Sequence, residues 1–96
     1  MKKNFPLRAP GKADARVVDA IKADVRRYVK RERRKPAPEG YDYWEVDCAV
    51  GLDQASAVST LLADVSKAID SVAATGADSV YVEVIAKPGK REAGKL

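Results

Sequence analysis

The spacing of apolar positions predicts a strand and a long helix in the first third of the chain. Residues 3–7 form a short apolar run, in which Pro6 limits the strand to hydrogen bonds on one side. From Asp14, the expected N-cap, apolar residues recur every three or four positions. They predict a helix that ends near residue 34, because Pro36 disfavours helical geometry in the residue before it. The apolar stripe of this helix consists of Val17, Val18, Ile21, Val25, Tyr28 and Val29.

The rest of the chain carries two strand patterns and a second helix. Residues 41–50 alternate between apolar and polar side chains, which predicts a half-buried strand with Trp44 as a core anchor. Residues 56–62 fit either the return arm of a hairpin or the start of the next helix. That helix is predicted from about residue 64 and is closed by Gly76. Residues 79–87 predict the last strand, in which one face carries Val80, Val82 and Val84.

The order of these elements is strand, helix, strand, strand, helix, strand. It is typical of the ferredoxin-like βαββαβ fold, an α+β fold with two helices packed on one face of a mainly antiparallel four-stranded sheet in the order 4-1-3-2. If residues 56–62 are not a strand, the expected fold is a three-stranded sheet with two helices. We expect one domain over residues 1–88 and a flexible basic tail over residues 89–96.

Composition narrows the class of protein. The chain has 96 residues, of which 46% are hydrophobic and 33% charged, and it has no long apolar stretch and no secretory signal. We therefore expect a cytoplasmic globular domain that does not bind membranes. Cys48 is the only cysteine and is expected to be a small buried side chain. Histidine is absent, which removes the commonest general base and the usual zinc ligands. We expect no enzymatic activity, no metal and no cofactor, and no small-molecule substrate is evident.

Positive charge is concentrated in one segment. Residues 26–35 hold seven positive residues and one negative, a net charge of +6, so the other residues together carry −2 of the total of +4. Helical spacing places six cations away from the apolar stripe: Arg26, Arg27, Lys30, Arg31, Arg33 and Arg34. Like-charged pairs four residues apart cost about 0.2–0.5 kcal/mol each, which favourable charge at the helix C-terminus roughly offsets. The segment therefore fits either a solvated face or a surface that binds a polyanion.

Nucleic acid is the polyanion that we expect, and RNA is preferred because nothing resembles a helix-turn-helix scaffold. Further positive charges lie near the termini, at Lys2, Lys3, Lys90, Arg91 and Lys95. The alternative is a protein partner or a second copy that binds the open face of the sheet. That face is expected to carry Tyr43, Glu45, Asp47, Tyr81, Glu83 and Ile85.

The acidic residues of this open face are a further candidate site. Glu45 and Asp47 share one face of a strand, and such a pair can hold Mg²⁺ weakly or act as an acid–base pair. In the ferredoxin-like order, however, their strand and the strand of Glu83 are the two edges of the sheet, about 14 Å apart. We therefore expect the three carboxylates not to meet, and to act mainly as a solvated surface.

Four segments of the chain are distinctive: MKKNFPL, ARVVDAIK, KRERRKPAPEGYDYWEVDC and YVEVIAKPGKR. They resemble a family of short bacterial proteins of unknown function. The resemblance covers nearly the whole chain, and the long middle segment is its most specific part. It implies a free-standing bacterial domain, and it implies neither an activity nor catalytic residues.

Overall fold

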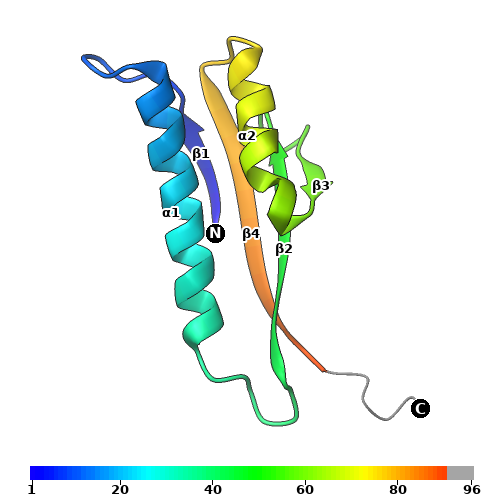
Figure 1. Cartoon of the computed structure of the whole chain (residues 1–96). Helices are drawn as coiled ribbons and strands as arrows, with labels where there is room; N and C mark the ends of the chain where they lie inside the picture. Colours follow the sequence, from blue (N-terminus) through cyan, green and yellow to red (C-terminus); the bar gives the residue numbers. More distant parts are fainter. Residues whose placement is uncertain (91–96) are drawn as a thin grey trace.

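The computed structural model describes residues 1–90 and forms an α+β fold in which two helices cover one face of a four-stranded sheet (Figure 1). Its elements in chain order are β1 (Lys2–Pro6), α1 (Asp14–Arg34), β2 (Tyr43–Gly51), β3 (Val58–Thr60), the 3-10 turn η1 (Leu62–Asp64), α2 (Val65–Ala74) and β4 (Ser79–Gly89). The predicted succession of strands and helices is therefore confirmed.

The strand order differs from the prediction. The sheet runs β1-β4-β2-β3 with every neighbouring pair antiparallel, so the ferredoxin-like order 4-1-3-2 was wrong. β4 lies in the centre because it is long and its core-facing Val80, Val82 and Val84 are almost completely buried. β1 is an edge strand of five residues, and its exposed lysines and Pro6 suit an edge.

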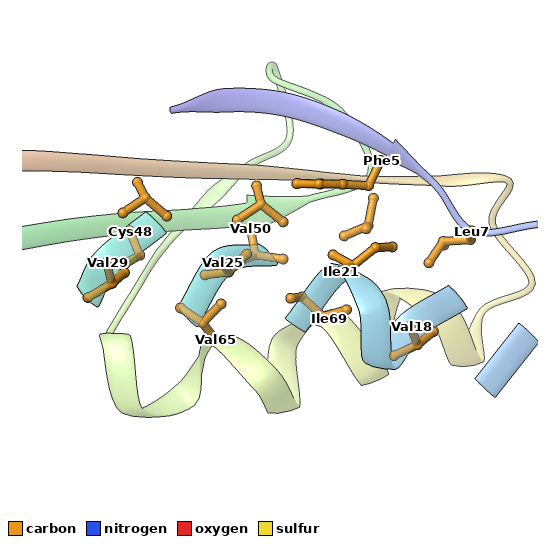
Figure 2. Packing of buried hydrophobic residues seen from close by; sticks show 13 residues of the cluster. Phe5, Leu7, Val18, Ile21, Val25, Val29, Cys48, Val50, Val65 and Ile69 are labelled. Atoms are coloured by element: carbon orange, nitrogen blue, oxygen red, sulfur yellow. The ribbon is translucent and has the colours of Figure 1, made fainter. Parts of the chain in front are cut away.

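α1 is held to the sheet along its apolar stripe. Figure 2 shows this packing from close by, with Val18, Ile21, Val25 and Val29 of α1 facing the sheet and α2. The first helical residue is Asp14, so the N-cap is Ala13, which offers no side-chain cap; the predicted Asp14 cap was wrong by one position.

Trp44 closes the other end of α1. Its indole Nε1 donates a hydrogen bond to the carbonyl oxygen of Lys35, 2.8 Å away, at the residue that follows the helix. Trp44 is half-buried and lies outside the cluster of buried core residues, so its prediction as a core anchor was wrong. The polar edge of an indole needs a hydrogen-bond partner, and the last carbonyls of a helix lack one.

Residues 56–62 divide between the two predicted possibilities. Val58–Thr60 form β3, which pairs with β2, and the helical backbone begins at Leu62. The preceding turn is closed by Asp53, whose Oδ1 accepts a hydrogen bond from the backbone N–H of Ser56 at 2.9 Å. Gly51 is required here because a Cβ atom would lie 2.7 Å from the Cα of Ala57.

The buried layer between helices and sheet contains the predicted valines and Cys48. Ile69, Val80 and Val82 have no exposed surface, and Cys48 is 6% exposed. Burial raises the pKa of the Cys48 thiol, as expected of a small core side chain. At the end of β4, the carbonyl oxygen of Gly89 accepts a hydrogen bond from Asp42 N–H, so Gly89, predicted as the first residue of the tail, belongs to the strand; residues 91–96 of the predicted tail lie outside the described residues.

Candidate functional site

All six predicted basic residues are exposed on the C-terminal half of α1. They fall into two groups that face different neighbours. Arg26, Lys30, Arg33 and Arg34 face α2 and are called the α2 flank. Arg27 and Arg31 face β1, together with Lys3 and Phe5, and are called the β1 flank. The two flanks share their chemistry and their helix, so any difference between them comes from their surroundings.

The cations of the β1 flank are engaged by neighbouring side chains. Arg27 forms an ion pair with Asp24 three residues before it. The guanidinium carbon of Arg31 lies 5.4 Å from the ring centre of Tyr28, which is a cation–π distance. Lys3, one of the N-terminal cations, lines the same hollow as Arg27 and Arg31.

The cations of the α2 flank have no such partners. Within residues 1–90, none of the four forms an ion pair or a side-chain hydrogen bond. Of the nearby acids, Asp24 binds Arg27, Glu32 lies 2.8 Å from Lys35 Nζ, and Asp42, which lines a hollow with Arg33, is also engaged. The hydrogen bond from Lys35 lowers the pKa of Glu32, so that this carboxylate stays ionised and paired. The α2 flank is therefore an uncompensated row of positive charge.

A groove runs between the α2 flank and α2. Its volume is about 480 Å³, and its apolar lining consists of Val25, Val29, Leu62, Val65 and Ile69. Lys22 lies at the same groove and binds Asp70 of α2 at 2.7 Å, so this cation joins the two helices instead of adding free charge. In Figure 1, the last turns of α1 extend beyond the start of α2. Sequence reasoning found the cations but assigned the apolar residues to the core and missed the groove.

The acidic strands lie side by side, contrary to the prediction that they are edges. β2 and β4 are the central pair, in which Asp47 is opposite Ile85 and Ala49 is opposite Glu83. The error follows directly from the wrong strand order. The predicted open-face residues therefore do share one surface, on the side of the sheet away from the helices.

Side chains of this open face satisfy one another. Asp47 binds Lys87 at 2.8 Å, which raises the pKa of Lys87. Tyr81 donates a hydrogen bond to Glu83, and Tyr43 donates one to Glu45. Tyr81 is only 4% exposed, and burial raises its pKa, with a smaller contribution from Glu83.

The acidic side chains of the open face do not form a metal site. Among residues 1–90, no three acidic or cysteine side chains gather closely enough to hold a metal ion.

Sequence reasoning also missed exposed apolar side chains on and near the short strand β3, which are called the β3 apolar group. This group consists of Leu52, Val58 and Leu61.

Comparison with known proteins places the chain in a family. A family model described as "Family of unknown function (DUF6172)" matches residues 1–95, so the chain belongs to that family, as its distinctive segments predicted. The searches of curated proteins and of solved structures found no match. No helix within residues 1–90 has the length and apolar character needed to cross a membrane.

Proposed function

We propose that this DUF6172 domain is a non-enzymatic binding protein that contacts nucleic acid, with RNA preferred, through the basic half of α1. The observation that carries the proposal is the α2 flank, where Arg26, Lys30, Arg33 and Arg34 are exposed and have no acidic partner within residues 1–90. Cationic side chains of this kind neutralise phosphates and release the counterions condensed on the nucleic acid, which supplies most of the affinity of non-specific binding.

The geometry of the helix supports contact with consecutive phosphates. Arg26, Lys30 and Arg34 are spaced by four residues and form a row along α1 with about 6 Å of helix rise between neighbours. The ring of Tyr28 lies on the β1 flank beneath Arg31, and the indole of Trp44, which lines a hollow with Arg33, is held by its hydrogen bond to the Lys35 carbonyl. The domain therefore contacts the backbone of the nucleic acid and has little sequence specificity.

The open face of the sheet is a poor surface for the same ligand. Glu45, Asp47 and Glu83 lie on it and repel phosphate, and Tyr81 is buried too deeply to stack with a base. This asymmetry favours the helix side of the molecule for the proposed nucleic-acid contact.

Fluorescence anisotropy with a labelled single-stranded RNA and a DNA duplex, at several salt concentrations, tests the proposal. The informative variant is R26Q/K30Q, and R27Q/R31Q is the matched control because it removes the same charge from the other flank. We expect a wild-type Kd of about 1–100 μM and, in R26Q/K30Q, a salt slope for RNA that is reduced by about 1.4. The control should retain most of the binding.

Two results would contradict the proposal in different ways. Equal losses in both double variants would show that net charge, and not the α2 flank, determines binding. No binding of either nucleic acid by the wild-type protein at about 50 mM salt would exclude the function itself, because electrostatic affinity is greatest at low salt.

A second candidate function is association with a partner protein or a second copy. It is favoured by the exposed apolar group at the edge strand β3, where Val58 is 66% and Leu61 is 74% exposed. Sedimentation velocity over a range of concentrations tests self-association. A concentration-dependent dimer that V58K abolishes would support this function, and a monomer at every concentration would limit it to a different partner protein.

A further inference from the structure

We infer that the groove between α1 and α2 binds an amphipathic anion with a single alkyl chain and a phosphate-type head group. The chain lies on the apolar lining of the groove, and the head group contacts the α2 flank. This ligand goes beyond the proposed contact with nucleic acid, because it needs the apolar lining in addition to the charge.

The apolar part of the site comes from both helices. Val25 and Val29 of α1 face Val65 and Ile69 of α2 (Figure 2), and Leu62 of η1 completes the lining. All of these side chains are aliphatic, and no acidic residue lines the groove. Its volume of about 480 Å³ lies within the range of small-molecule sites, which is about 300–1,000 Å³.

The shape of the groove favours a thin chain over a partner helix. Val25, Val29, Val65 and Ile69 are between 0% and 7% exposed, so the floor is a narrow strip that a wide ligand cannot reach, and Leu62 is the most open apolar side chain of the lining. An α-helix with its side chains is about 10–12 Å across and needs a broad apolar surface. An alkyl chain instead can lie in the furrow between the helices, flanked by the aliphatic stems of the arginine and lysine side chains.

The charged part of the site is confined to one wall. The cations of the α2 flank lie along α1, and Ser66 contributes a hydroxyl group from α2. The remaining cation at the groove, Lys22, is neutralised by Asp70, so the free charge lies toward the C-terminal end of α1. A phosphate monoester carries about −1.5 to −2 charges near pH 7 and accepts paired hydrogen bonds from arginine. It therefore matches several free cations better than a carboxylate does.

The test is calorimetric titration of the protein with decyl phosphate below its critical micelle concentration. We expect saturable binding of one molecule, weaker by about twofold for each CH2 removed from the chain, because the groove is open on one side and complete burial of a CH2 would give about fourfold. Decanoate should bind more weakly than decyl phosphate, and butyl phosphate and inorganic phosphate should show no measurable binding. Decyltrimethylammonium, which has the same chain and the opposite charge, should not bind.

Variants separate the two parts of the site. S66F fills the groove from an exposed position of α2 and leaves every cation in place, so it should abolish binding of decyl phosphate and leave RNA binding intact. R26Q/K30Q should weaken decyl phosphate at least tenfold, whereas R27Q/R31Q should leave it unchanged. Circular dichroism and thermal unfolding would verify that each variant is folded.

Each outcome bears on one proposal at a time. Decyl phosphate that binds folded S66F as well as wild type, or butyl phosphate that binds as well as decyl phosphate, would overturn the groove site whatever RNA does. Binding to phosphatidic acid vesicles without binding to monomeric decyl phosphate would also overturn it, and would indicate a membrane surface. Loss of RNA binding alone would overturn only the nucleic-acid function.

Discussion

The two flanks of α1 differ in their neighbours and not in their residues. On the β1 flank, Asp24 and the ring of Tyr28 engage Arg27 and Arg31. On the α2 flank, Arg26, Lys30, Arg33 and Arg34 stand beside an apolar groove and have no acidic partner within residues 1–90. The comparison shows that exposure of a cation does not by itself indicate a binding site. The state of its neighbours decides whether its charge is available to a ligand.

The largest expected effect concerns the residues beneath the α2 flank. Ile69→Ala removes a fully buried side chain that packs between α1 and α2, and it should lower the free energy of unfolding by about 2–5 kcal/mol. Urea unfolding followed by circular dichroism measures this loss. L62A is the control, because Leu62 is only partly buried and should cost clearly less. Equal losses would show that the groove floor is not part of the core.

A smaller change in the free energy of unfolding tests whether the charges of the two flanks differ in their compensation. Arg26→Glu turns the repulsive pair with Lys30 into an attractive one, while Lys22 is already paired with Asp70, and it should raise the free energy of unfolding by about 0.4–1 kcal/mol. Arg27→Gln removes the ion pair with Asp24 and should lower it by about 0.3 kcal/mol. Chemical denaturation measures both values.

Opposite signs in the two variants would show that positive charge on the α2 flank is kept at the expense of stability, as a binding site requires. If Arg26→Glu destabilises the protein, the α2 flank has compensating contacts and the comparison between the flanks fails.

The smallest effect is a dependence on pH at Glu32. Its pKa is lowered in the folded protein by the hydrogen bond from Lys35, so its contribution to stability is present above the ordinary glutamate pKa of about 4.3. This contribution is lost as the pH falls through the lowered value. The stability difference between wild type and E32Q should therefore be larger at pH 7 than at acidic pH. A difference that does not change with pH would show that Glu32 is not paired, and that its charge is available to the α2 flank.

Sequence periodicity was sufficient to predict the local elements. The end of α1 at Arg34, the buried valines of β4 and the glycine that ends α2 depend on the order of residues within each segment, and each is as predicted. The predictions were wrong where the position of a side chain or a strand depends on a segment that is distant in the chain. Trp44 has the spacing of a core residue, but the position of the Lys35 carbonyl decides where its indole binds. The strand order fails for the same reason, because a pattern within one strand does not specify its neighbours.

For the candidate site, the sequence by itself determined that six cations project from the outer side of one helix, because helical periodicity separates them from the apolar stripe. It also determined that Glu32 was the only acid among them. Tertiary structure alone decided which cations are free and that an apolar groove lies beside them. The groove joins Val25 and Val29 to Leu62, Val65 and Ile69, residues more than thirty positions away in the chain. Contacts between such distant segments depend on how the two helices pack on the sheet, and no pattern within either helix encodes that packing.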